Sequence, residues 1–157
     1  MNTNVDILLV EDSKEDMELT LYALRLGNFA NNIFVVHDGD EALDFLFCRG
    51  AFAERSLAHP PKLVLLDLKL PKMGGLEVLK ELKSDPQTKT IPVVIMTSSR
   101  QERDLCEAYG CAVNGYVQKP VDFEEFRTTV TTLGAYWLAV NQPPVNQRVQ
   151  LAMKAKA

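Results

Sequence analysis

Three carboxylates, one hydroxyl and one amine follow short apolar runs of this sequence. In chain order they belong to Glu11, Asp12, Asp67, Thr97 and Lys119. Carboxylates held within a few ångströms of one another repel unless a cation lies between them, and Mg²⁺ is a hard cation that takes such oxygen ligands. A carboxylate beside a dication, a hydroxyl and an ammonium group can also attack phosphorus, because these groups stabilise the developing negative charge. The five side chains are therefore candidates for a phosphoryl-transfer site with Mg²⁺ as cofactor and Asp67 as nucleophile.

Five apolar runs rich in β-branched residues precede these side chains or lie between them. They are Ile7–Val10, Ile33–Val36, Leu63–Leu66, Ile91–Met96 and Val113–Val117. Their apolarity is continuous rather than alternating, which is typical of strands covered on both faces of a parallel sheet. Segments with helical periodicity separate them, so strand and helix alternate five times. This pattern predicts an α/β fold with a doubly wound, five-stranded parallel sheet, whose strand ends bring the candidate residues to one edge.

The expected helices begin with capping signals. Ser13, with Asp16 three residues later, opens the first helix, and Asp122, with Glu125, opens the last. The other three are expected over residues 39–48, 75–84 and 101–109. Along the last helix runs an apolar seam, for which we weigh packing against an interface and expect packing against the core: Phe123, Phe126, Val130, Leu133 and Trp137.

Two stretches depart from this repeat. Residues 49–61 form a longer connection than such units usually need. The last residues, 145–157, have little apolar mass, and the sequence leaves open whether they are disordered or form a weak docking helix. We therefore predict one domain over residues 5–138 and a C-terminal tail over residues 139–157.

Composition narrows the class of protein. The chain has 157 residues, 46% of them hydrophobic and 24% charged, and no apolar run approaches the roughly 20 residues that cross a bilayer. The N-terminus lacks a secretory signal, and the three cysteines, Cys48, Cys106 and Cys111, form no metal-binding or disulfide pattern. The net charge of −4 gives no general attraction to nucleic acid. We expect a soluble cytoplasmic protein that binds neither membranes nor nucleic acid.

The sequence resembles the receiver domain of two-component response regulators over about residues 5–138. The motifs are ILLVEDS, LVLLDLKLPKMGG, VVIMTSS and GYVQKP. The resemblance implies the flavodoxin-like strand order 2-1-3-4-5 and names Asp67 as the phosphoacceptor, assisted by Thr97 and Lys119. It also implies that the backbone carbonyl of Lys69 completes the Mg²⁺ shell of Glu11, Asp12 and Asp67, and that the bond before Pro120 is cis.

The resemblance further implies a conformational switch and bears on the rate of autodephosphorylation. Tyr116 matches the aromatic switch position, whose ring follows Thr97 inward on phosphorylation and reshapes the surface of the fourth helix, fifth strand and fifth helix. Lys69 and Ser99 occupy the two positions that tune attack by water on the phosphorylated acceptor. Neither is a carboxylate or amide suited to orienting water, so we predict slow autodephosphorylation.

Partners follow from the same resemblance. The phosphodonor would be a sensor histidine kinase, and the long connection and the DLKLP motif look similar to stand-alone regulators of phytochrome-type kinases. The sequence leaves the oligomeric state open, with dimerisation through the surface of the fourth helix, fifth strand and fifth helix as one alternative. The segment after Trp137 does not resemble a helix-turn-helix, so output would be relay to a phosphotransfer protein or binding of a target, and the sequence does not choose between them.

Two other functions are less compatible with this sequence. Phosphatases with an aspartyl nucleophile need a second Asp two residues later, where this chain has Lys69. A receiver-like binding module that is never phosphorylated would not need all five site residues. We therefore expect a phosphoacceptor signalling protein rather than an enzyme. We expect His37 and His59 to lie away from strand ends at the active edge and to have no metal or catalytic role.

Overall fold

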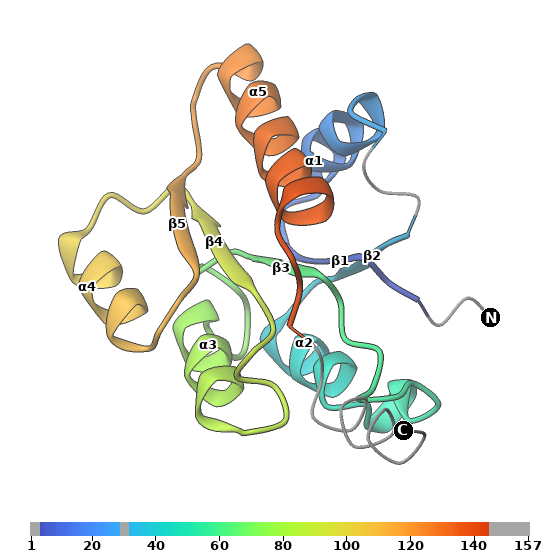
Figure 1. Cartoon of the computed structure of the whole chain (residues 1–157). Coiled ribbons are helices and arrows are strands. Elements are labelled where there is room, and N and C mark those ends of the chain that lie inside the picture. The colour runs from blue at the N-terminus through green and yellow to red at the C-terminus, as the bar shows by residue number, and fades with distance from the viewer. Residues whose placement is uncertain (1–3, 29–31, 145–157) are drawn as a thin grey trace.

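A five-stranded parallel sheet forms the centre of the computed structural model, which describes residues 4–28 and 32–144 (Figure 1). Its strands lie in the order β2-β1-β3-β4-β5, as predicted. Their bounds are β1 Ile7–Val10, β2 Ile33–Val36, β3 Leu63–Leu66, β4 Val93–Thr97 and β5 Gly115–Gln118. The first three coincide with the predicted runs, and the last two begin two residues later than predicted. The predicted fold class is confirmed.

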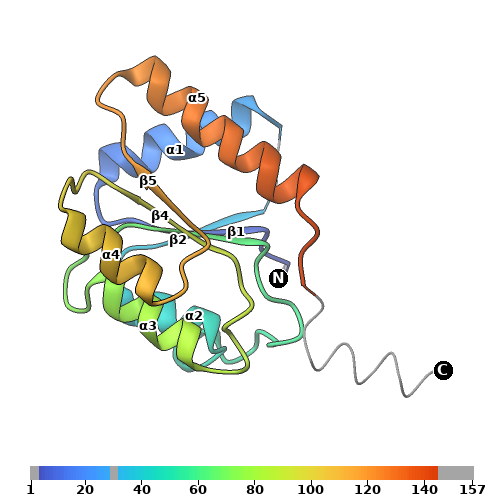
Figure 2. The ribbon, with the colours of Figure 1, turned by 60° about the vertical axis from the view of Figure 1, so that its left-hand side comes forward.

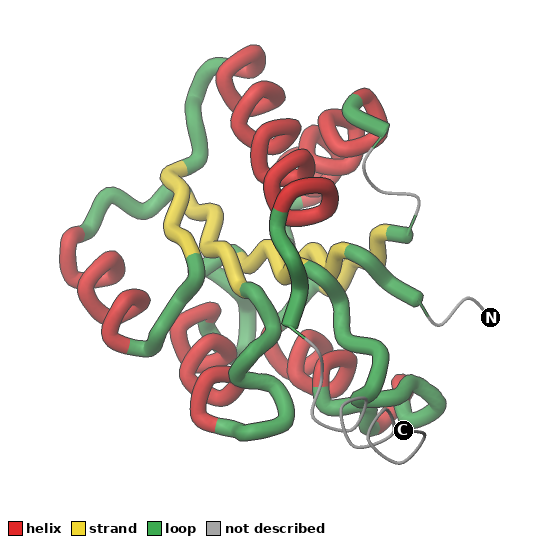
Figure 3. Tube along the Cα trace, in the orientation of Figure 1, coloured by secondary structure: helices red, strands yellow, loops and turns green. Residues whose placement is uncertain are grey.

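Helices cover both faces of the sheet (Figures 2 and 3). They are α1 Lys14–Leu26, α2 Gly39–Leu46, α3 Gly75–Ser84, α4 Glu102–Gly110 and α5 Phe123–Gly134. One apolar core lies between the sheet and α2, α3 and α4, and the other lies between the sheet and α1 and α5. Alternate residues of each central strand enter the two cores, which explains why these strands are apolar throughout.

The two edge strands are less buried than the central ones. Every residue of β1, β3 and β4 is buried, whereas β2 has one buried residue and β5 has none. Phe34 of β2 remains 37% exposed. Continuous apolarity therefore predicted the strands correctly but overstated the burial of those at the edges.

Both predicted helix starts are confirmed. The Ser13 hydroxyl accepts a hydrogen bond from the Asp16 amide at 3.3 Å, and the Asp122 carboxylate accepts one from the Glu125 amide at 3.0 Å. These bonds satisfy amides that have no partner inside the first turn of a helix.

The apolar seam of α5 packs only in part. Phe126 and Val130 are buried, and Leu133 and Trp137 pack against the same core from its margin. Phe123 is 46% exposed, so its assignment to the core was wrong. It is the first residue of α5. A π-helix over Ala135–Val140 continues α5.

The long connection over residues 49–61 is packed against α2. It contains a 3₁₀ helix, Gly50–Phe52, whose Phe52 ring contacts the rings of Phe34 and Phe45 at centroid distances of 5.6 and 5.1 Å. The Arg55 guanidinium lies 3.6 Å from the Phe45 ring centroid and donates a 2.6 Å hydrogen bond to the Phe45 carbonyl. An aromatic cluster and one cation–π contact thus hold the connection in place.

The end of the described chain lies at the amino-terminal edge of the sheet. Pro143 and Pro144 line a cavity of about 480 Å³ there, together with residues of the long connection. The prediction for residues 145–157 lies outside the described residues, and the domain boundary at residue 138 stays a prediction. No helix within residues 4–28 and 32–144 is long and apolar enough to cross a membrane.

Candidate functional site

Strand register brings two predicted carboxylates side by side. Val10 pairs with Leu66 at the ends of β1 and β3, so that Glu11 and Asp67 leave the sheet together. The Asp67 amide donates to the Val10 carbonyl at 3.1 Å, which fixes the backbone at the point where the carboxylate projects. The carboxyl edge of the sheet is where ligands bind in open parallel α/β folds.

A cluster of carboxylates that could hold a metal ion lies among the described residues and consists of Glu11, Asp12 and Asp67. One carboxylate oxygen from each lies within 4.8 Å of the other two. Glu11 and Asp67 are buried, whereas Asp12 is exposed. Three oxygen donors, one of them open to solvent, match the requirements of Mg²⁺, which binds through a few carboxylates and keeps several waters. These residues therefore fit the predicted cation.

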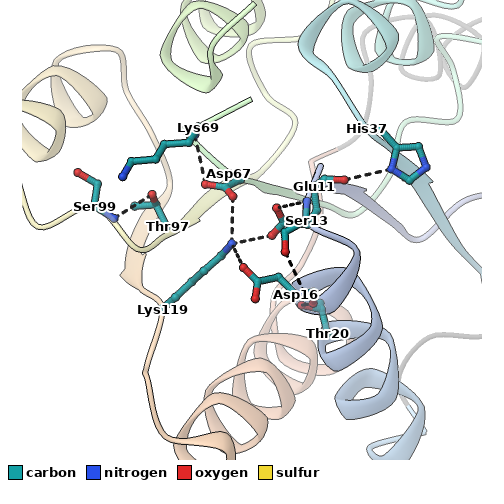
Figure 4. A network of polar contacts seen from close by, with 10 residues as sticks. All are labelled: Glu11, Ser13, Asp16, Thr20, His37, Asp67, Lys69, Thr97, Ser99 and Lys119. Carbon is teal, nitrogen blue, oxygen red and sulfur yellow. Dashed lines mark hydrogen bonds and ion pairs between the residues drawn. The ribbon is translucent and has the colours of Figure 1, made fainter. Parts of the chain in front are cut away.

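Lys119 reaches into this cluster from the end of β5. Its ammonium donates to Glu11 Oε1 at 2.6 Å, to Asp16 Oδ2 at 2.7 Å and to Asp67 Oδ2 at 3.0 Å (Figure 4). The side chain is only 9% exposed. Burial alone would lower the pKa of Lys119, but the hydrogen bonds to Asp16 and Glu11 and the charge of Asp67 together raise it above its ordinary value. All three protons of the charged ammonium thus have a carboxylate acceptor.

Glu11 is the carboxyl group most affected by burial. Desolvation raises the pKa of Glu11 to about 7; Lys119 opposes this rise, and the nearby Asp67 carboxylate adds to it. Without a cation Glu11 therefore takes up a proton as the pH falls through about 7. A dication would release that proton, because it stabilises the charged form of its ligand.

The end of β4 is connected to α4 through hydrogen bonds. Thr97 Oγ1 accepts from the Ser99 amide at 3.2 Å, and the Ser99 hydroxyl donates to Asp104 Oδ2 at 2.5 Å. Asp104 lies in the first turn of α4. The side chain of Thr97 is thereby tied to α4 by two successive bonds.

Tyr116 lies beside this connection. Its hydroxyl is buried and has no hydrogen-bond partner among the described residues. Burial raises the pKa of Tyr116, and the charge of Asp104 adds to the rise. The hydroxyl is therefore already inside in this structure, and the role of Tyr116 as a switch stays a prediction.

Lys69 contributes its backbone to the site. Its amide donates to Asp67 Oδ1 at 3.3 Å (Figure 4), which leaves the two oxygens of Asp67 with different partners. The Lys69 side chain is exposed. The predicted role of its carbonyl as a metal ligand stays a prediction.

The turn after Asp67 is closed by a glycine. The Gly75 amide donates to the Leu68 carbonyl at 2.9 Å. A Cβ on Gly75 would collide with the Asp67 carbonyl oxygen and would lie 2.7 Å from the Leu68 Cα. The start of α3 therefore packs directly against the backbone of the candidate phosphoacceptor.

Two predictions about single residues were wrong. The bond before Pro120 is trans, because no peptide bond among the described residues is cis. The trans form is favoured by about 0.5–1 kcal/mol for bonds to proline, and Lys119 makes its three carboxylate contacts from that form. His37 does follow a strand end: it comes directly after β2, and its Nδ1 lies 3.2 Å from the Glu11 carbonyl oxygen (Figure 4).

Asp16 is the site residue that the sequence did not reveal. It was assigned to the start of the first helix, and its amide does serve there, but its carboxylate binds Lys119. No local spacing indicated this contact, because Lys119 is 103 positions away in the chain.

Comparison with protein families gives one match. A family model described as the response regulator receiver domain matches residues 7–131. Among curated proteins, the chain is 41% identical over 138 residues to the probable methanogenesis regulatory protein FilR2 of Methanothrix harundinacea, which covers 88% of this chain and 86% of FilR2. It is 38% identical over 132 residues to the response regulator Rcp1 of Synechocystis sp., which covers 84% of this chain and 88% of Rcp1.

Solved structures agree with this match. The phosphorylated cyanobacterial phytochrome response regulator RcpA is similar with a TM-score of 0.83 and 38% identity, over 90% of this chain and 99% of RcpA. The Mn²⁺-bound form of Rcp1 gives a TM-score of 0.82 and 37% identity, over 88% of this chain and 97% of Rcp1. One similar protein has thus been solved with a divalent cation and another in a phosphorylated state.

Proposed function

Because this chain belongs to the response regulator receiver domain family, we propose that Asp67 accepts a phosphoryl group from the phosphohistidine of a sensor histidine kinase. The observation that supports this best is the position of the Asp67 carboxylate. One of its oxygens accepts a hydrogen bond from the Lys119 ammonium, and the carboxylate also belongs to the cluster with Glu11 and Asp12. The chain would act as a signalling protein that assists only its own phosphorylation and the slow loss of the phosphoryl group.

The transfer forms one bond and breaks one. A carboxylate oxygen of Asp67 bonds to phosphorus while the bond from phosphorus to the kinase's histidine nitrogen breaks, and that nitrogen keeps the electron pair. The Lys119 N–H that now meets Asp67 Oδ2 is placed to donate to a phosphoryl oxygen, and the Thr97 hydroxyl is the second donor. Mg²⁺, held by Glu11, Asp12, Asp67 and the Lys69 carbonyl, would supply the positive charge that offsets repulsion between the carboxylates and the phosphoryl group.

The first experiment is direct. The purified protein is incubated with Mg²⁺ and acetyl phosphate and examined by intact mass and Phos-tag electrophoresis, with Asp67→Asn alongside. We expect a hydroxylamine-labile gain of one phosphoryl group that is lost in Asp67→Asn and with EDTA. If no gain is seen, a phosphorylated histidine kinase is tried as donor, and failure with both donors would exclude the proposed phosphoacceptor role.

We propose that the phosphoryl group is long-lived. The hydroxyl of Ser99 donates to Asp104 at 2.5 Å, and the Lys69 side chain ends in an ammonium group rather than in a carboxylate or amide suited to orienting water. The measurement is decay of the phosphorylated band after donor removal. A lifetime of only seconds would contradict this proposal.

The switch is proposed to run from Thr97 to α4. On phosphorylation the Thr97 hydroxyl would turn to the phosphoryl group and release the Ser99 amide, which alters the contact between Ser99 and Asp104 at the start of α4. The adjoining surface bears exposed apolar residues, namely Leu105, Tyr109, Val121 and Phe123. We propose that this surface binds the downstream partner or a second copy. Light scattering with and without acetyl phosphate tests dimerisation.

We propose a phytochrome-type kinase as the upstream partner, acting with this protein in the cytoplasm. RcpA is named as a phytochrome response regulator, and the similarity covers 90% of this chain. FilR2, which is named for methanogenesis, shows that similar proteins serve other pathways. Parallel phosphotransfer assays from a phytochrome kinase and from an unrelated histidine kinase test the choice, and equal rates would remove the support for a phytochrome partner.

A further inference from the structure

The Lys119 ammonium contacts three carboxylates, and one of them, that of Asp16, has no role in the proposed phosphoryl transfer. Glu11 and Asp67 belong to the carboxylate cluster, but Asp16 does not, and it still lies 2.7 Å from Lys119 Nζ. Asp16 comes from the first turn of α1, whereas Lys119 comes from the end of β5 (Figure 4).

The cap of α1 does not need the Asp16 carboxylate. In a reciprocal capping box that carboxylate would bind the Ser13 amide. Here the Ser13 amide donates to Glu11 Oε2 at 3.3 Å instead, and only the amide of Asp16 takes part in the cap. The carboxylate is thereby free to face Lys119, and it remains 33% exposed.

We propose that Asp16 is a positioning residue for phosphoryl transfer to Asp67, which acts by anchoring Lys119. An ammonium group has three donors and rotates freely unless they are held. Glu11 and Asp16 hold two of them on the α1 side, which leaves the third directed at Asp67 Oδ2, where the phosphoryl group would arrive. This inference rests on the proposed function and adds a residue to the same site.

Anchoring of Lys119 by Asp16 can be distinguished from a purely electrostatic effect of the Asp16 charge. Removal of the Asp16 charge would ease the approach of an anionic donor and weaken cation binding, whichever neutral residue replaces it. Anchoring depends instead on whether the replacement still offers an oxygen to Lys119. Asp16→Asn keeps such an oxygen in the same place, whereas Asp16→Ala removes it, and both variants have the same net charge. The ratio between them therefore isolates the anchor.

The test compares phosphorylation rates with acetyl phosphate at saturating Mg²⁺. We expect Asp16→Ala to be phosphorylated about five- to tenfold more slowly than Asp16→Asn. The two variants have the same charge, so the difference would reflect only the lost contact that orients Lys119. The matched control is the neighbouring exposed acid of the same helix turn, for which Glu15→Gln and Glu15→Ala should react equally fast. Equal rates for the two Asp16 variants would overturn the proposal. If Asp16→Ala does not fold, Asp16→Ser, whose hydroxyl is too short to reach, takes its place.

A second readout follows Lys119 itself. In ¹⁵N spectra of the metal-free protein, a slowly exchanging Lys119 ammonium signal should persist in Asp16→Asn and broaden beyond detection in Asp16→Ala. In the Lys119→Met background the two Asp16 variants should be phosphorylated at equal rates, and a surviving difference would assign Asp16 a purely structural role. If the wild-type protein takes up no phosphoryl group, the proposed function fails and the positioning role with it. Uptake with equal rates for the two Asp16 variants defeats the positioning role alone.

Discussion

The two halves of the carboxyl edge of the sheet differ strongly in how far their residues are buried. On the side of β1 and β3, every strand residue is buried, and Glu11 and Asp67 are joined through Lys119. On the side of α4 and β5, the helix has one buried residue, Ala108, and the strand has none. The carboxylates Glu11 and Asp67 thus belong to the rigid half, Lys119 reaches them from the end of β5, and the surface proposed for output belongs to the loosely packed half.

This difference shows how one site can be both precise and responsive. Phosphoryl transfer requires donors held close to their productive geometry, whereas a switch requires an element that a few lost contacts can move. Ser99 and Asp104 join the two halves through side-chain hydrogen bonds.

The largest expected effect is in the rigid half. Leu66→Ala removes a fully buried side chain at the end of β3 and should lower the free energy of unfolding by about 2–5 kcal/mol. Leu105→Ala in α4, where the side chain is 38% exposed, should change it by no more than about 0.5 kcal/mol. Urea denaturation followed by circular dichroism measures both. Similar losses in the two variants would remove the contrast.

The next effect concerns pH. Since burial raises the pKa of Glu11 to about 7, the proton on Glu11 competes with Mg²⁺, and the apparent affinity should fall about tenfold from pH 8 to pH 6. Calorimetric titration with Mg²⁺ measures it, and a constant affinity across this range would contradict the prediction.

The sign of the stability change follows from the same raised pKa. In EDTA the folded state keeps a proton on Glu11 that the unfolded chain has already lost above its ordinary pKa of 4.5. The contribution of Glu11 to stability is therefore present below pH 4.5 and is lost as pH rises through about 7. Urea denaturation at pH 5 and pH 8 should show the decrease, and saturating Mg²⁺ should reduce it.

The smallest effect is local to α4. Ser99→Ala removes the hydrogen bond to Asp104 and should loosen the first turn of α4 by about 1 kcal/mol, with little change in global stability. Hydrogen exchange of the α4 amides should quicken about fivefold, since 1 kcal/mol corresponds to roughly that factor. Unchanged exchange in α4 would show that this bond does not connect the two halves.

The sequence predicted the parts of the fold that depend on local patterns. Three strands coincided with their apolar runs, and the caps at Ser13 and Asp122 were correct. These features arise from residues close together in the chain, where hydrophobic period and capping chemistry act directly.

What the sequence missed depends on contacts between distant segments. Asp16 and Lys119 are separated by 103 positions, and only the fold shows that the Ser13 amide is already occupied by Glu11. The exposure of Phe123 likewise depends on where α5 lies over the sheet. The trans bond before Pro120 departs from what the family resemblance implied, and no local pattern indicated it.

Gly75 has a consequence for how this protein can change over generations. Because any side chain there would strike the backbone of Asp67, no single substitution at Gly75 is tolerated without displacing the proposed phosphoacceptor. New specificity must arise elsewhere, on surfaces such as α4, where side chains are free to vary. The structure thereby restricts substitution at Gly75 beside the proposed phosphoacceptor and permits it on the surface proposed to bind partners.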